Sequence, residues 1–103
     1  MTIIIAGGGK VGATLAEHLA DEGHSVTIVD VSGDTLDRLA NQLDVMCVKG
    51  NCVSREVLLE AGAKETDVLI AATDSDEINL LCCHIAHRLG LPYTVGYVAA
   101  QQI

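Results

Sequence analysis

The sequence IIIAGGGKVG, residues 3–12, joins a short aliphatic run to a glycine-rich turn. Gly7, Gly9 and Gly12 fit the pattern G-x-G-x-x-G, which is weak evidence by itself. Here the glycines follow a predicted strand and open a predicted helix, which is the context in which such a turn binds a pyrophosphate. In that turn the first glycine allows the tight bend, the second lets backbone approach phosphate, and the third lets the helix pack closely on the strand.

Short apolar runs alternate with helical patterns along the rest of the chain. Strands are predicted at residues 3–6, 25–29, 45–48, 68–71 and 94–98, and helices at residues 11–22, 32–42, 54–61 and 76–88. This alternation predicts an α/β fold of the Rossmann type, with a doubly wound parallel sheet in strand order 3-2-1-4-5 and a single domain over residues 1–103. Many such folds carry a sixth strand, so we expect the chain to be the front part of a longer protein.

Apolar stripes predict which face of each helix points inward. The expected inward residues are Val11, Leu15 and Leu19 in the first helix, Leu36, Leu39, Ala40 and Leu43 in the second, and Ile78, Leu81, Cys82, Ile85 and Leu89 in the last.

Composition excludes several classes of protein. The formal net charge is −8, and six Lys and Arg residues do not supply the basic stripe that a nucleic-acid binder needs. The longest apolar run is far below the roughly 20 residues of a membrane span. The first residues lack the basic and hydrophobic regions of a signal peptide, so we expect a cytoplasmic protein whose four cysteines are reduced thiols.

Asp30 ends the second predicted strand, 18 residues beyond Gly12. A carboxylate at this place accepts hydrogen bonds from the adenosine ribose hydroxyls and repels a 2′-phosphate. No Arg follows in Val31, Ser32, Gly33 or Asp34, so the pattern favours NAD(H) over NADP(H). The alternative is a glycine-rich turn that packs without ligand, with Asp30 as a local cap.

Over nearly all of its length the chain resembles the nucleotide-binding regulatory domain of TrkA-type potassium uptake proteins, also called the RCK or KTN domain. The resemblance is carried by IIIAGGGKVGATLAEHL, HSVTIVD, VKGN and, most specifically, LLEAGAKETDVLIAATDSDEINLLCC at residues 58–83. It implies a cytosolic, non-enzymatic domain that dimerises and assembles into rings beneath a membrane potassium channel or transporter. It also implies binding of NAD(H), with ATP, ADP or AMP as other possible ligands.

The resemblance also implies which residues hold the nucleotide. They are Gly7, Gly8, Gly9, Lys10 and Val11 at the phosphates, Asp30 and Val31 at the ribose, Gly50, Asn51 and Cys52 along the adenine, and Ala72, Thr73, Asp74 and Glu77 at the phosphates or the distal half of the ligand.

One position departs from the family pattern. Many relatives carry Arg on the fifth strand, in a pattern like I-A-R-I, where it meets the terminal phosphates of ATP. This chain has Tyr97 there, and a phenol supplies neither the charge nor the bidentate fork of Arg. The substitution favours NAD(H) over ATP as the ligand.

Two side-chain clusters have alternative interpretations. Asp74, Asp76 and Glu77 fit a capping box with Asp74 as N-cap, or a divalent cation held through a bound nucleotide. Cys83 and His87 lie four residues apart on one helical face, as ordinary helix residues or as half of a metal site.

Three functions remain open on the sequence. The first is a ligand-sensing regulatory domain of a potassium transport system. The second is the cofactor-binding fragment of an NAD-dependent dehydrogenase, and the third is an interaction module that binds no ligand. We also expect self-association through an apolar face beyond the fifth strand, formed by Val95, Val98 and Ile103.

Overall fold

The first strand, β1 (Thr2–Ala6), lies at the centre of a parallel sheet because its aliphatic side chains are buried on both faces. In the computed structural model, which describes residues 1–99, four further strands complete the sheet in the order β3-β2-β1-β4-β5. They are β2 (Ser25–Asp30), β3 (Met46–Lys49), β4 (Val68–Ala71) and β5 (Tyr93–Gly96). The predicted strand order and Rossmann-type fold are therefore confirmed.

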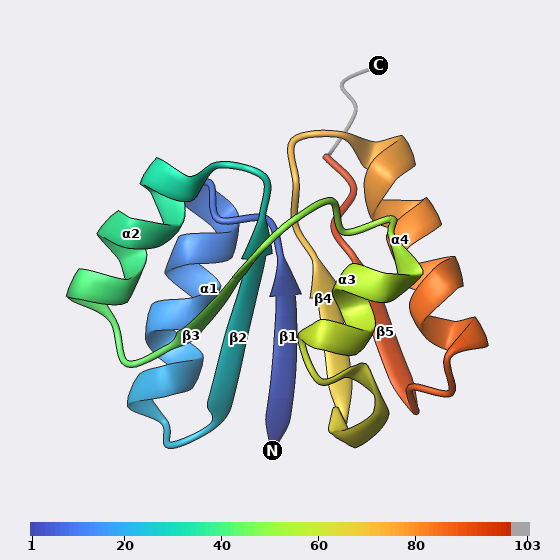
Figure 1. Ribbon diagram of the computed structural model, residues 1–103, viewed down its shortest axis with the longest axis horizontal. Coiled ribbons are helices and arrows are strands. Elements are labelled where there is room, and N and C mark those ends of the chain that lie inside the picture. Colours follow the sequence, from blue (N-terminus) through green and yellow to red (C-terminus); the bar gives the residue numbers. More distant parts are fainter. Residues whose placement is uncertain (100–103) are drawn as a thin grey trace.

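Helices cover both faces of this sheet (Figure 1). They are α1 (Lys10–Asp21), α2 (Gly33–Gln42), α3 (Arg55–Glu60), the short 3₁₀ helix η1 (Ala63–Glu65) and α4 (Asp76–Arg88). The helices α1 and α2 pack on one face, and α3, η1 and α4 pack on the other. No described helix has the length and apolarity that crossing a bilayer requires.

Side chains of β1 alternate between the two cores. Ile3 and Ile5 join Ile28 and the residues of α1 and α2, whereas Ile4 joins Leu69 and the residues of α3 and α4. A one-residue slip of β1 would exchange these faces, so the alternation fixes the register of the central strand.

Of the four α-helices in residues 1–99, three begin with a serine cap. The hydroxyls of Ser32, Ser54 and Ser75 each accept a hydrogen bond from the backbone N–H three residues on, at 3.2, 3.3 and 3.2 Å. The expectation that Asp74 caps α4 is therefore wrong, because Ser75 occupies that place. The helix α1 has Gly9 at its N-cap and so has no side chain to cap it.

The inward faces of the helices differ from the apolar stripes in several places. In α4 the fully buried positions are Asn79, Cys82 and Ala86, while Ile78 and Leu81 are exposed. In α1 the buried positions are Gly12 and Ala16, flanked by the half-buried Val11, Leu15 and Leu19, and in α2 Ala40 is exposed. In α1 and α4 the line of contact with the sheet is formed by small or medium-sized side chains and bulkier residues lie beside it, whereas α2 buries Leu36 and Leu39 as expected.

Candidate functional site

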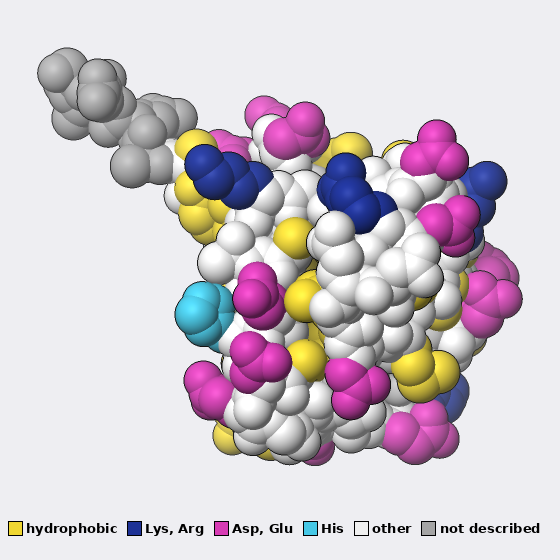
Figure 2. Space-filling view, turned by 90° about the vertical axis from the view of Figure 1, so that its left-hand side faces the viewer, with side chains coloured by type: hydrophobic (Ala, Val, Ile, Leu, Met, Phe, Trp, Pro, Cys, Tyr) yellow, Lys and Arg dark blue, Asp and Glu magenta, His cyan; other side chains and the backbone are white. Residues whose placement is uncertain are grey.

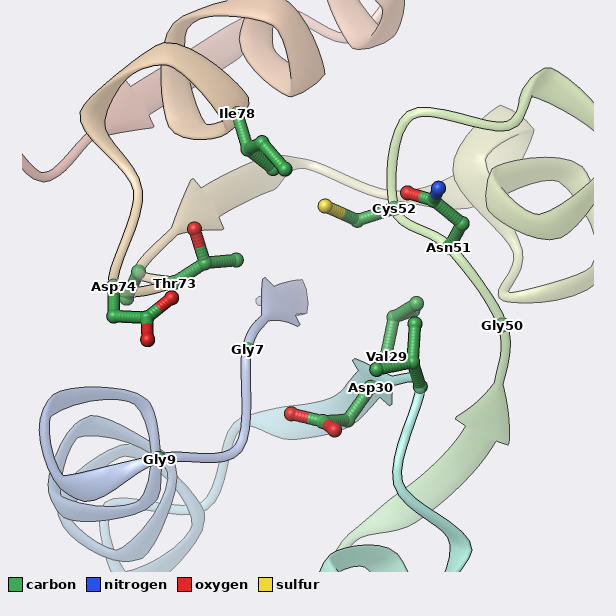
Figure 3. Close-up of a pocket in the computed structure, with 12 residues that line it drawn as sticks. Gly7, Gly9, Val29, Asp30, Gly50, Asn51, Cys52, Thr73, Asp74 and Ile78 are labelled. Atoms are coloured by element: carbon green, nitrogen blue, oxygen red, sulfur yellow. The ribbon is translucent and has the colours of Figure 1, made fainter.

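A hollow of about 410 Å³ opens at the carboxyl ends of β1, β2, β3 and β4 (Figure 3). It lies between β1 and β4, where the chain winds off in opposite directions, and ligands bind at such switch points in open α/β sheets. The lining residues are Gly7, Gly9, Val29, Asp30, Val31, Gly50, Asn51, Cys52, Ala72, Thr73, Asp74 and Ile78.

The glycine turn forms one wall of the hollow. The three glycines of the G-x-G-x-x-G pattern each have a different structural role in it. Gly7 has a φ of 109°, which is costly for other residues, and its N–H donates to the carbonyl of Val29 at 2.8 Å. A Cβ on Gly12 would overlap the carbonyl oxygen of Gly7, so glycine is needed for the helix to approach the turn. A Cβ on Gly9 would meet nothing within 4 Å, so this residue leaves open space beside the start of α1.

Asp30 ends β2, and its carboxylate points toward the glycine turn at the edge of the hollow (Figure 3). One carboxylate oxygen accepts a hydrogen bond from the Gly8 N–H at 2.7 Å, and the other accepts from the Ser32 N–H at 2.8 Å. A carboxylate has about four acceptor positions, so these two bonds leave room for ligand hydroxyls.

Thr73 lies at the end of β4 and is held by Asn79, whose exposed fraction is 0%. The Asn79 Oδ1 accepts from the Thr73 N–H at 2.8 Å and from its hydroxyl at 2.7 Å. The Nδ2 of Asn79 donates to the Thr73 carbonyl at 3.1 Å and to the Tyr97 carbonyl at 2.8 Å. Sequence reasoning missed Asn79; the available signal was a polar residue within the apolar pattern of a helix.

The remaining wall is apolar and includes a thiol. Val29 and Ile78 line it, and sequence reasoning missed both. Cys52 points into the hollow (Figure 3). It accepts a hydrogen bond from the buried thiol of Cys82. This bond lowers the pKa of Cys52 because it stabilises the thiolate, whereas the same bond and burial raise the pKa of Cys82.

A second hollow of about 280 Å³ adjoins the first. The two share Gly9, Ala72, Thr73 and Asp74, and the second is completed by Lys10, Val11, Asp76, Tyr97 and Ala99. Lys10 is the one basic residue among the described residues that line either hollow. An elongated ligand could therefore cross from one hollow to the other beside the start of α1.

The structure brings most of the expected site residues together. Those lining the first hollow are Gly7, Gly9, Asp30, Val31, Gly50, Asn51, Cys52, Ala72, Thr73 and Asp74, and those added by the second are Lys10 and Val11. Gly8 lies behind the lining residues, and its N–H donates a hydrogen bond to the carboxylate of Asp30. Glu77 accepts a hydrogen bond from the Ser75 hydroxyl at 3.3 Å and lines neither hollow as described over residues 1–99.

The two clusters with alternative interpretations have other contacts. Asp76 accepts a hydrogen bond from the Ala99 N–H at 3.2 Å. The Cys83 thiol hydrogen-bonds the side chain of Thr94, and burial raises its pKa. Within residues 1–99, no three His, Cys, Asp or Glu side chains group as a metal site would need. All four cysteines are free.

The face that includes α2 is predominantly acidic (Figure 2). Its acidic side chains are scattered, and its basic side chains lie apart from one another, most of them near the upper edge and one low on the right. This face presents no continuous basic stripe of the kind that tracks a phosphate backbone.

A family model, the TrkA-N domain, matches residues 3–101 of the chain. The chain is 47% identical over 89 residues to the Trk system potassium uptake protein TrkA of Halomonas elongata, covering 86% of this chain and 20% of that protein. It is 36% identical over 99 residues to the TrkA homolog of Methanothermobacter thermautotrophicus, covering 96% of this chain and 46% of that protein. The chain thus spans less than half the length of both relatives.

Solved structures share the fold. The Kef CTD of Shewanella denitrificans, in an AMP-bound form, superposes with a TM-score of 0.77 at 26% identity, covering 92% of this chain and 57% of that one. The NAD(P)-binding domain of an exopolyphosphatase-related protein from Archaeoglobus fulgidus superposes with a TM-score of 0.78 at 18% identity, covering 90% and 70%. The second likeness concerns the fold alone.

Proposed function

The chain belongs to the TrkA-N domain family, and from this premise we propose that it binds an adenine nucleotide, with NAD(H) preferred, as the regulatory module of a potassium transport system. The observation that carries the proposal is the meeting of a bare glycine turn and a fixed carboxylate in one hollow. Gly9 leaves space for phosphate beside the uncapped start of α1, and Asp30 faces that space. Helix N-termini favour anions, and a carboxylate favours ribose hydroxyls.

The first hollow suits the adenosine half of the ligand. Asp30 would accept from the ribose hydroxyls while it keeps its two backbone bonds. Val29 and Ile78 would contact the adenine ring, and the Gly50–Cys52 turn would lie along its edge. Most ligand sites combine such an apolar lining with a few fixed polar groups.

The second hollow suits the distal half of a dinucleotide. Lys10 would face the pyrophosphate, and Tyr97 would contact the nicotinamide riboside with its amphipathic ring. ATP is a poorer fit because its γ-phosphate would meet Asp74 and Asp76, with Lys10 as the one cation among the lining residues that the structure describes. AMP would occupy the first hollow alone, as a smaller ligand of the same site.

Direct titration tests the binding proposal. The protein is titrated by calorimetry with NADH, NAD, NADPH, ATP without metal, and AMP. We expect NADH or NAD to bind more tightly than NADPH and ATP. Absence of binding by all five would overturn the proposal and leave the ligand-free interaction module as the better reading. Hydride transfer from NADH to a small substrate would favour the dehydrogenase alternative.

The regulatory role is tested by transplantation into a relative whose matching segment is 47% identical over 89 residues. The chain replaces the matching segment of the Halomonas elongata relative, and potassium uptake is measured in cells that depend on that relative. We expect uptake to be restored by the chimera and lost when Gly9→Val is added. Normal uptake with Gly9→Val would separate potassium transport from nucleotide binding.

We further propose that the domain acts at the cytoplasmic side of its membrane partner and self-associates. The strand β5 lies at one edge of the sheet over residues 1–99 and carries Val95, and Val98 follows it, both about half-exposed. Ile103, expected on the same face, lies outside the described residues. Sedimentation at a protein concentration on the order of 10⁻⁵ M should show dimers held by a modest apolar interface. A monomer alone would count against self-association.

A further inference from the structure

Asn79 stands behind the wall of the second hollow and joins two of its parts. Its side-chain oxygen accepts hydrogen bonds from the N–H and the hydroxyl of Thr73. Its side-chain nitrogen donates to the carbonyls of Thr73 and Tyr97, at 3.1 and 2.8 Å. The orientation of the amide is fixed by its partners, because a backbone N–H can only donate and a carbonyl can only accept. Asn79 itself lines neither hollow.

The two residues that Asn79 holds come from different strand ends. Thr73 follows β4 and lines both hollows, while Tyr97 follows β5 and lines the second hollow only. Tyr97 is also held by its own N–H, which donates to the Ala71 carbonyl at 2.8 Å. Both residues therefore have fixed positions relative to α4, and the amide of Asn79 connects them.

The contacts also restrict what Thr73 can offer a ligand. Its hydroxyl lies 2.7 Å from the Asn79 Oδ1 and 3.2 Å from the Ser75 carbonyl, and it accepts from the Ser75 N–H at 3.2 Å. The hydroxyl proton is thus used within the protein. The rotamer and the backbone of Thr73 are set by Asn79 before any ligand arrives.

We propose that Asn79 is a positioning residue that sets affinity for the distal half of an extended nucleotide, by holding Thr73 and Tyr97 as one wall of the second hollow. The inference rests on the proposed binding of a dinucleotide across both hollows. A mononucleotide that occupies the first hollow alone meets Thr73 but not Tyr97, so it uses only part of this wall. Asn79 therefore acts on selectivity between the two ligand classes as well as on folding.

The same link reaches the segment that follows β5. The Ala99 N–H donates to Asp76 at 3.2 Å, so residues 97–99 are held against α4 at two points. A ligand that presses on Thr73 or Tyr97 changes the free energy of this arrangement. By linkage, if binding of the distal half changes the equilibrium of residues 97–99 by some factor, their arrangement changes the affinity for the distal half by that same factor.

The test compares NADH with AMP by calorimetry in the wild-type chain and in Asn79→Ala. We expect NADH affinity to fall by at least about tenfold, since several fixed polar groups lose their partner, while AMP affinity, which depends on Thr73 but not on Tyr97, falls clearly less. The matched control is Thr66→Val, which removes another buried polar side chain, bonded to the Gly62 carbonyl at 2.6 Å and distant from both hollows. The control should leave the ratio of the two affinities unchanged.

A measurement on the wild-type chain covers the case in which Asn79→Ala does not fold. In nitrogen-edited NMR spectra, the side-chain amide signals of Asn79 should shift strongly on addition of NADH and less on addition of AMP. Equal shifts with both ligands, or equal losses of both affinities in the variant, would overturn the positioning role while leaving nucleotide binding intact. Failure of both ligands to bind the wild-type chain would instead overturn the proposed function and this inference with it.

Discussion

The carboxylate of Asp30 accepts a hydrogen bond from the backbone N–H of Gly8 at 2.7 Å, which ties the end of β2 to the glycine turn. The second oxygen takes the Ser32 N–H at 2.8 Å, at the start of α2. One side chain therefore fixes three backbone segments around the hollow. A carboxylate held in this way needs little reorganisation to receive a ribose, which reduces the cost of binding.

Asp30 should select a free ribose 2′-hydroxyl. We expect NAD(H) to bind at least about tenfold more tightly than NADP(H), which is about 1.4 kcal/mol. Asp30→Asn should reduce this preference, because the amide no longer repels a 2′-phosphate. It should also lower the free energy of unfolding by about 1 kcal/mol, since one of the two backbone bonds loses its acceptor. Competition titration and denaturant unfolding measure the two effects.

Asp34→Asn is the matched control for Asp30→Asn. Asp34 is exposed in the first turn of α2, and its substitution removes the same charge. It should leave the selectivity unchanged. Equal affinities of the wild-type chain for NADH and NADPH would contradict the role given to Asp30.

Gly9→Val should abolish nucleotide binding without unfolding the domain. A side chain at this position meets no protein atom within 4 Å, so it would extend into the space proposed for phosphate. Gly33→Val is the control, because position 33 also opens a helix and its Cβ would meet only the Lys49 side chain at ordinary contact distances. If a folded Gly9→Val protein bound the nucleotide with unchanged calorimetric affinity, the glycine turn would not be part of the binding site.

Tyr97→Arg should improve the binding of metal-free ATP selectively. Tyr97 is 43% exposed and lines the second hollow, where an Arg would add a bidentate cation for a terminal phosphate. Tyr93→Arg adds the same charge on β5, at a residue that is 68% exposed and lines neither hollow. The control should change ATP affinity little. A wild-type chain that prefers metal-free ATP over NADH and NAD would show that the role given to Tyr97 is wrong.

The Cys52 thiol should react at lower pH than the other cysteines. The hydrogen bond from Cys82 lowers the pKa of Cys52, whereas burial raises the pKa of both Cys47 and Cys83. Alkylation by iodoacetamide, followed by peptide mass spectrometry across a pH series, should accelerate first at Cys52 because the thiolate is the reactive form.

Bound nucleotide should protect Cys52, since this thiol is 6% exposed and is reached through the first hollow. Protection by NADH or AMP, with unchanged labelling of Cys47, is the expected pattern. Labelling of Cys47 or Cys83 at lower pH than Cys52 would contradict the predicted order.

The fold was predictable because its determinants are local. Residues 3–12 specify a strand, a turn and a helix in one stretch, and the alternation of apolar runs specifies the parallel sheet. The inward face of α4 was not predictable, because it depends on how closely the helix approaches the sheet. Ile78 and Leu81 follow the helical period, yet Asn79 takes the buried position through its bonds to Thr73 and Tyr97.

The candidate site was predictable where it follows strand ends, and less so where it depends on packing. Asp30 and Thr73 lie in the first hollow because parallel strands end at one edge of the sheet. Val29 and Ile78 were missed because aliphatic residues in a strand or a helix carry no sign of lining a cavity. The second hollow depends on the path of the chain after β5, which no sequence pattern specified.

The uncapped start of α1 has a consequence for local dynamics. Because Gly9 supplies no side-chain acceptor, the first backbone amides of this helix are the ones a bound phosphate would satisfy. We expect these amides to exchange hydrogen rapidly in the free domain and slowly once nucleotide is present. The ligand would then complete a helix that the chain leaves unfinished, so the stiffness of this first turn would report whether the domain is occupied.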